Sequence, residues 1–209
     1  MFQRWKARLA ASAELRPVTL PLFPLQALVF PGGVLPLKIF EQRYMDMAKE
    51  CLRSESAFGV CLIKEGHEVG AAVPHRIGTL VRIDQWDMPQ LGVLNVRVLG
   101  QQRFEIQDYE TQADGLLMAR VIKIPAEPDF PLPPEHAACA VVLEQIIEHL
   151  GQDKFEPPFL YDDSTWVGYR LAEILPIKSS AKQDMLEMND AQIRLDVLHK
   201  FLAKQGLTT

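Results

Sequence analysis

The sequence has few cysteines, and their arrangement narrows the possible chemistry. Among 209 residues there are three, Cys51, Cys61 and Cys139, with an odd count and no C-x-x-C pair. This pattern argues against a disulfide framework and indicates a reducing compartment. Neither the cysteines nor the five histidines show the spacing of zinc ligands. We therefore expect buried thiols and no metal.

Long apolar runs are also missing. No stretch approaches the roughly 20 consecutive apolar residues that a membrane-spanning helix needs. The first residues, MFQRWKARLAASAELR, have a basic start and an Ala-Ser-Ala triplet but lack the apolar core of a signal peptide. We expect residues 1–17 to form a tail or a short helix, and the protein to be cytoplasmic, with no membrane partner.

There is no excess of positive charge. The formal net charge is -5, and no basic patch of useful length occurs. An acidic chain gains little from releasing counterions on a phosphate backbone, so nucleic acid is not an expected partner. Hydrophobic residues make up 48% of the chain, which is typical of a globular protein.

The motifs of common catalytic sites are absent as well. There is no G-x-x-x-x-G-K-[ST] loop to hold the phosphates of ATP. Lys178 stands next to Ser179 and Ser180, but adjacent side chains rarely reach each other as a catalytic pair, and Ser180 is better placed to cap a helix. We expect no catalytic residues and no cofactor, and hence a protein that is not an enzyme.

Two stretches of different character follow the N-terminus. Residues 18–124 contain short Val-, Leu-, Ile- and Phe-rich runs broken by Pro and Gly, which indicates strands, while residues 135–209 have apolar spacing typical of helices. Between them, residues 125–134 hold five prolines and should form a stiff linker. The predicted fold class is α+β: a small β-barrel with one inserted helix, followed by a helical bundle.

The pattern also predicts individual elements. Apolar residues recur at helical spacing from Phe40 to Cys51, which predicts a helix over 40–53 with Phe40 on its buried face. Gly100 is expected to form a turn between two strands. Capping-box spacing predicts that Ser180 and Asn189 begin the last two helices.

Several sequence blocks closely resemble the N-terminal domain family of Lon proteases. The family pattern L-P-L-F-P-L, V-F-P-G and L-P-L-x-I-F-E-x-R-Y is matched, in order, by Leu20–Leu25, Val29–Gly32 and Leu35–Tyr44. The resemblance continues through IGTLVRI at 77–83, LNVRVLGQQRFEI at 94–106, YRLAEILPI at 169–177 and KQDMLEMNDAQIRLDVL at 182–198. It therefore covers almost the whole chain after residue 17.

The resemblance implies a fold and a kind of partner. The family's fold is a PUA-like β-pseudobarrel followed by helices. In Lon proteases this region engages substrates, so the resemblance implies a stand-alone, non-catalytic module that binds unfolded or partly folded polypeptides. It could act with a separate protease or chaperone. The alternative is an RNA-binding protein, because PUA-like barrels elsewhere bind RNA.

One segment is suited to contacting such a partner. Residues 84–92 join two predicted strands and carry Trp86, Met88 and Leu91 on an expected exposed hairpin. Large, adaptable apolar side chains at such a tip are good anchors for an irregular apolar ligand. Trp86 folded back onto the barrel is the other possibility. For Glu41 and Arg43 we expect a structural role, holding neighbouring loop backbone through charged hydrogen bonds.

Overall fold

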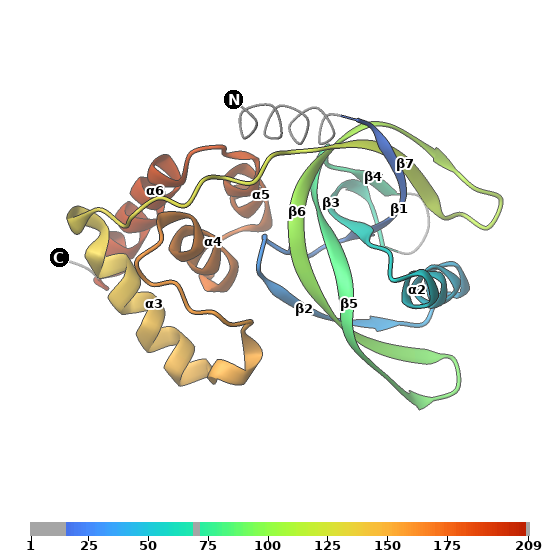
Figure 1. The fold of residues 1–209 in the computed structure, drawn as a ribbon, viewed down its shortest axis with the longest axis horizontal. Helices are drawn as coiled ribbons and strands as arrows, with labels where there is room; N and C mark the ends of the chain where they lie inside the picture. Colours follow the sequence, from blue (N-terminus) through green and yellow to red (C-terminus); the bar gives the residue numbers. More distant parts are fainter. Residues whose placement is uncertain (1–15, 69–71, 208–209) are drawn as a thin grey trace, which may run out of the picture. The chain divides into compact units, whose positions relative to one another are not determined.

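The computed structural model describes residues 16–68 and 72–207 (Figure 1). Most of the expected N-terminal tail or helix, residues 1–17, lies outside these described residues. The chain divides into two compact units, Met1–Pro31 with Leu35–Ala126, and Gly32–Val34 with Glu127–Thr209.

In its described residues, the first unit is built on one mixed sheet with one helix, α2, which spans Gln42–Ser54. The strands of the sheet are β1 Val18–Leu25, β2 Val34–Ile39, β3 Phe58–Gly66, β4 Ala72–Pro74, β5 Ile77–Gln90, β6 Val93–Thr111 and β7 Leu117–Lys123. Helices follow in the second unit, so the α+β prediction is confirmed.

The sheet closes on itself. Its strands run in the order β1-β7-β6-β5-β3, and β1 also pairs with β3 in parallel, with Leu22 opposite Gly59. The pairings β1–β7, β3–β4, β3–β5, β5–β6 and β6–β7 are antiparallel. A closed ring has no free edges among its own strands. β4 and β2 lie outside this ring. β4 pairs with β3, and β2 pairs with β6.

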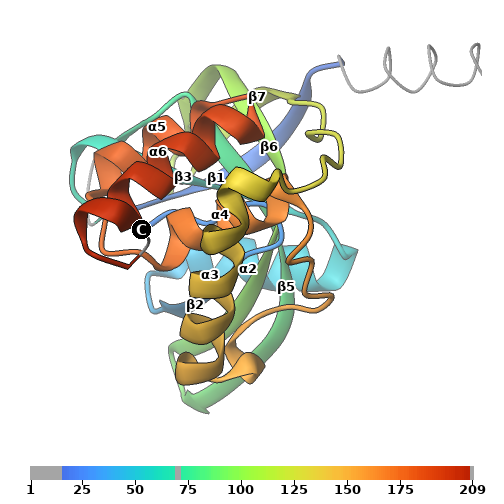
Figure 2. The ribbon, with the colours of Figure 1, turned by 90° about the vertical axis from the view of Figure 1, so that its left-hand side faces the viewer.

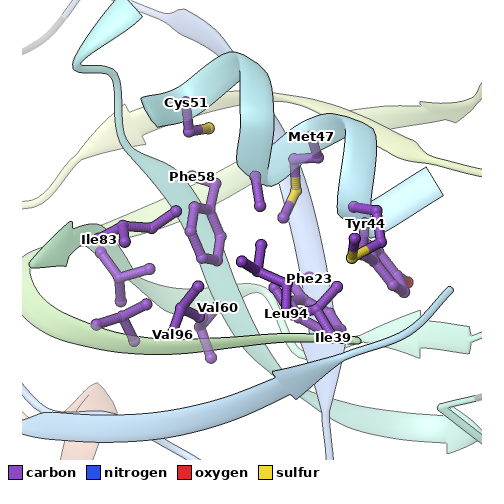
Figure 3. Close-up of a cluster of buried hydrophobic side chains, with 14 of the residues drawn as sticks. Phe23, Ile39, Tyr44, Met47, Cys51, Phe58, Val60, Ile83, Leu94 and Val96 are labelled. Atoms are coloured by element: carbon purple, nitrogen blue, oxygen red, sulfur yellow. The ribbon is translucent and has the colours of Figure 1, made fainter. Parts of the chain in front are cut away.

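A large apolar cluster fills the space between α2 and the strands (Figure 3). Helix α2 contributes Tyr44, Met47, Ala48 and Cys51, whose spacing puts them on one face of the helix. Phe58, which is fully buried, lies opposite this face. The buried stripe predicted for this helix is therefore confirmed for these four residues.

Phe40 does not belong to that stripe, and its predicted burial is wrong. Glu41 is the N-cap of α2 and has extended backbone angles, φ -78 and ψ 135. Phe40 therefore precedes the helix, and its side chain is 61% exposed. The predicted helix start at residue 40 is thus two residues too early.

The turn predicted at Gly100 is also wrong, because β6 runs through it without interruption. A Cβ atom at residue 100 would lie 2.1 Å from the carbonyl oxygen of Phe30. Glycine is needed here because another segment of backbone approaches the strand closely, and not because the chain reverses direction. A register shift relative to β5, between Thr79 and Val81, accompanies this position.

Helices make up most of the second unit. They are α3 Ala137–Leu150, α4 Ser164–Ile174, α5 Ser179–Glu187 and α6 Ala191–Lys204, with short turns η1 Pro134–His136 and η2 Gln152–Lys154. Figure 2 shows α3, α4 and α6 packed against one another, with Leu143, Leu171 and Leu195 fully buried. No helix of the described ranges is long and apolar enough to cross a membrane.

The helix starts in this unit differ from those predicted. The N-cap of α5 is Lys178, so Ser180 lies inside the helix. The N-cap of α6 is Asp190, whose carboxylate accepts hydrogen bonds from the backbone N–H groups of Gln192 and Ile193. Capping-box spacing located both helices but missed the capping residue, because neighbouring polar residues compete for that position.

A buried ion pair joins the start of the second unit to its helices. Arg194 on α6 is fully buried and donates from Nη2 to Glu127 Oε2 at 2.5 Å and from Nη1 to Glu127 Oε1 at 3.1 Å. The Tyr169 hydroxyl on α4 donates to the same carboxylate, and the guanidinium lies 4.0 Å from the Tyr169 ring centroid. Glu127 is thus held by two helices.

Candidate functional site

β5 and β6 extend past the ring of strands as a two-stranded hairpin (Figure 1). β5 pairs with β3 only at Thr79–Val81, so its C-terminal half has β6 as its one neighbour among the described strands. The segment 84–92, predicted to join two strands, is mostly strand itself. The chain reverses at Leu91 and Gly92, where Gly92 has a φ of 83 that glycine adopts easily.

The three residues predicted to contact a partner all belong to this hairpin, and all are exposed. The exposed fractions are 60% for Trp86, 39% for Met88 and 96% for Leu91. Trp86 is paired with Val96, so the two side chains share one face of the hairpin. Val96 is buried in the apolar cluster under α2. Trp86 therefore lies on the same face of the sheet as the core residue Val96. Its contact with a partner remains a prediction.

The strands of the hairpin are braced at their base. Arg97 on β6 forms an ion pair with Asp84 on β5, and both side chains are largely shielded from solvent. Arg97 is paired with Gln85, the neighbour of Trp86 in the strand, so its side chain lies on the face opposite to Trp86. The hairpin therefore has an apolar face, which carries Trp86, and an opposite face on which the ion pair between Arg97 and Asp84 joins its two strands.

A hollow of about 230 Å³ lies beside β2 in the same unit. It is mostly apolar, with three charged side chains. Its lining residues are Phe23, Leu25, Ala27, Leu35, Pro36, Leu37, Lys38, Ile39, Phe40, Glu41, Tyr44 and Glu68. Phe23, Ile39 and Tyr44 also form one end of the cluster in Figure 3, where the rings of Phe23 and Tyr44 stack 4.0 Å apart.

A second hollow of about 450 Å³ shares Tyr44 with the first. It is lined by Pro24, Arg43, Tyr44, Ala72, Val73, Tyr109, Thr111, Gly115 and Leu117. Val73 and Tyr109 are 41% and 40% exposed. Both hollows are shallow surface features built on strands of the first unit.

Arg43 and Glu41 form a hydrogen-bonded group beside Tyr44, the residue that lines both hollows. Arg43 donates from Nη1 to the carbonyl oxygen of Gly115 at 2.8 Å and from Nη2 to Glu41 Oε2 at 2.8 Å. Its guanidinium lies 4.6 Å from the Tyr44 ring centroid. Burial raises the pKa of Tyr44, so this phenol stays protonated at neutral pH. The expected role of holding loop backbone is confirmed for Arg43. Glu41 contributes indirectly, because its carboxylate accepts a hydrogen bond from Arg43.

The cysteine thiols are shielded from solvent and from reaction. All three cysteines are buried, and desolvation raises the pKa of Cys139 to about 11 and raises that of Cys61 further. Such thiols are poor nucleophiles because they remain protonated. In residues 16–68 and 72–207, no group of three or more His, Cys, Asp and Glu side chains is arranged to hold a metal ion.

The hollow beside β2 was not predicted from the sequence. Pro36 within a strand and Phe40 just before a helix were available signals, since both are unusual in a fully paired, buried segment. Helical periodicity assigns Phe40 to the buried face of the helix, so the sequence does not indicate that Phe40 is exposed beside a hollow. The lining also joins residues from β1, β2 and α2, which sequence spacing alone cannot bring together.

The chain resembles proteins of known family. A family model described as the ATP-dependent protease La (LON) substrate-binding domain matches residues 19–204. Among solved structures, the chain is similar to a Lon N-terminal domain protein from Xanthomonas campestris. That match has 37% identity and a TM-score of 0.74, and covers 88% of this chain and 98% of the other.

More distant matches extend the similarity. The N-terminal domain of the Mycobacterium avium complex Lon protease has 17% identity and a TM-score of 0.59, covers 89% of this chain and 98% of that one, and shows a common fold. The Lon protease of Heliobacterium modesticaldum is 27% identical over 195 residues, which cover 89% of this chain and 24% of that protein. The chain spans about a quarter or less of the length of the curated relatives that it matches.

Proposed function

Because the chain belongs to the ATP-dependent protease La (LON) substrate-binding domain family, we propose that it binds polypeptide substrates without acting on them chemically. The finer role is that of an adaptor, or a chaperone-like binder, which engages the exposed apolar segments of unfolded or partly folded proteins. The family match over residues 19–204 is the observation that carries this proposal.

In this proposal, the hairpin supplies the contact surface for such clients. Trp86, Met88 and Leu91 present apolar area to solvent from one two-stranded element. Fully burying one large apolar side chain stabilises a complex by about 1.5–3 kcal/mol. An unfolded client can adapt its own side chains to this tip, and methionine can repack around different partners. Weak, broadly selective binding is the expected result.

A binding titration with an unfolded client tests the proposal. The client is reduced, carboxymethylated α-lactalbumin carrying a fluorophore, and native α-lactalbumin is the folded control. We expect the protein to bind the unfolded form and not the native form. If the wild-type protein binds neither form, or binds both equally, the proposed function is wrong.

Variants of the hairpin locate the contact. Trp86→Ala and Leu91→Ser should each weaken binding of the unfolded client by about fivefold or more, since each removes one exposed anchor. Ile193→Ser on α6 is the matched control, because Ile193 is 53% exposed and lies outside the hairpin. Binding that is equally strong in all three variants would remove the hairpin from the proposal while leaving polypeptide binding in place.

An aggregation assay separates the two finer roles. A chaperone-like binder, added in excess, slows the heat-induced aggregation of a client protein by covering its exposed apolar surface. An adaptor that merely delivers its client has no such effect at concentrations near its dissociation constant. Suppression that is lost in Trp86→Ala would support the chaperone-like role.

A further inference from the structure

β2 has a neighbour along one side only. It pairs with β6, and the sheet contains no other pairing to β2 among the described residues. The ring of strands is closed, so its own members are paired on both sides along much of their length. β2 lies outside the ring, and backbone groups along its second side are available to another strand.

The hollow of about 230 Å³ follows this strand along its length. Five consecutive residues of the strand, Leu35–Ile39, line it, as does Phe40 just after the strand. Successive side chains of a strand point to opposite faces, so a hollow that touches all five strand residues lies along the side of the strand and not on one face. Phe23 and Leu25 from β1 and Tyr44 from α2 supply apolar surface within it.

Pro36 indicates which backbone groups face this hollow. A proline has no N–H and is accommodated in a strand where its nitrogen faces away from the paired neighbour. Backbone groups alternate in direction along a strand, so Lys38 has the same orientation as Pro36. The carbonyl of Pro36 and the N–H and carbonyl of Lys38 are thereby directed away from β6.

We propose that an extended segment of a client polypeptide adds to the free side of β2 as a new strand and places a bulky apolar side chain in the hollow. This inference rests on the proposed function, and names the form in which the substrate is bound. Main-chain hydrogen bonds supply affinity that is independent of sequence, while the hollow selects a large aliphatic or aromatic residue.

The charged side chains that line the hollow determine which residues are favoured beside the apolar residue of the client. Glu41 is ion-paired with Arg43, so the carboxylate of Glu68 and the ammonium group of Lys38 are the lining charges left to a client. The Glu68 carboxylate favours a lysine or arginine beside the client's apolar residue.

Peptides with methylated backbones test strand addition directly. The probe is a fluorescein-labelled peptide, KVTFTVK, and two derivatives carry N-methyl groups either on the threonines or on the valines and phenylalanine. A strand that pairs along one side directs every second N–H to its partner. One derivative should therefore lose at least about tenfold in affinity, while the other stays within about twofold of the parent. Equal affinities for the two derivatives would rule out strand addition.

A substitution that fills the hollow tests the location. Ala27 lines the hollow and is exposed, so Ala27→Trp should occupy the hollow without disturbing the core. Ala113→Trp is the control, since Ala113 is an exposed turn residue of the same unit that does not line this hollow. We expect Ala27→Trp to weaken KVTFTVK binding by about tenfold or more and Ala113→Trp to leave it unchanged.

The outcomes distinguish this inference from the function on which it rests. If wild-type protein fails to bind unfolded α-lactalbumin, the proposed function itself is wrong. If it binds that client, but Ala27→Trp binds KVTFTVK and the client as tightly as wild type, the β2 site is wrong and the function stands. Thermal unfolding of both tryptophan variants, with midpoints matching wild type, shows that any loss comes from the site.

Discussion

The guanidinium of Arg43 is joined by a 2.8 Å hydrogen bond to the carbonyl oxygen of Gly115, a residue 72 positions further along the chain. One side chain at the start of α2 therefore holds the loop that precedes β7. Because Arg43 also pairs with Glu41 and lies over the ring of Tyr44, it links three parts of the first unit.

Removing this side chain should destabilise the first unit. Arg43→Ala is expected to lower the free energy of unfolding by about 2–3 kcal/mol, as is typical when charged hydrogen bonds in a shielded site are lost. Urea unfolding followed by circular dichroism measures the change. Arg53→Ala is the control, because Arg53 pairs with Glu50 in an exposed position, and we expect no measurable change. Similar losses in both variants would contradict the role given to Arg43.

Gly100 and Gly92 should respond differently to the same substitution. Gly100→Ala drives a Cβ into the carbonyl oxygen of Phe30, so we expect a loss of at least about 3 kcal/mol, or no folded protein. A Cβ at Gly92 meets nothing within 4 Å, and only its φ of +83 opposes it. Gly92→Ala should therefore lose about 1 kcal/mol. Urea titrations of the two variants measure both losses in the free energy of unfolding. A larger loss in Gly92→Ala than in Gly100→Ala would contradict this prediction, because strain in the hairpin turn would then outweigh the clash.

The buried pair of Arg194 and Glu127 predicts a non-additive result. Arg194→Met leaves the Glu127 carboxylate, which is 4% exposed, without its counter-charge and should lower the free energy of unfolding by about 3–5 kcal/mol. The double variant Arg194→Met with Glu127→Leu removes both charges and should lose less than Arg194→Met alone. A double-mutant cycle in urea measures this coupling, and additive losses would show that the two groups act independently.

The buried thiols predict a dependence of stability on pH. Desolvation raises the pKa of Cys139 to about 11, above the value of about 8.5 for a thiol in an unfolded chain. The folded state holds this proton more tightly, so its contribution is intact below about pH 8.5 and is lost as the pH rises towards 11. Thermal unfolding from pH 8 to 10.5 should show a falling midpoint, and the fall should be smaller in Cys139→Ala.

Helix capping distinguishes the structure from the sequence prediction. Asp190→Ala removes the carboxylate that accepts from two backbone N–H groups at the start of α6, and should lower the free energy of unfolding by about 1 kcal/mol. Ser180→Ala should change it by less than about 0.5 kcal/mol, because Ser180 does not cap α5. A larger loss for Ser180→Ala than for Asp190→Ala would support the capping-box interpretation instead.

Local patterns in the sequence were sufficient for much of the fold. Short apolar runs located β3 and β5, alternating apolar residues located β6, and helical spacing located α2 and the helices of the second unit, because burial of one face imposes the periods of two and 3.6 residues. The family resemblance, carried by blocks such as Leu20–Leu25, predicted the family whose model matches residues 19–204.

Other features depend on contacts between distant segments and could not be predicted. The requirement for glycine at residue 100 comes from the backbone of Phe30, and sequence alone does not distinguish such an approach from a turn. For the candidate site, the exposed hairpin with Trp86 could be placed from the sequence. The hollow beside β2 could not, since it forms only when β1, β2 and α2 come together.

The position of Glu127 affects how the protein can be divided for separate study. It lies in the proline-rich segment 125–134, which the sequence predicts to be a stiff linker, yet its carboxylate is the counter-charge of Arg194. A recombinant helical fragment that starts at residue 135 would contain Arg194 buried without that partner, and we expect it to be poorly folded. A fragment that starts before Glu127 retains the pair, so expression trials should place the cut there.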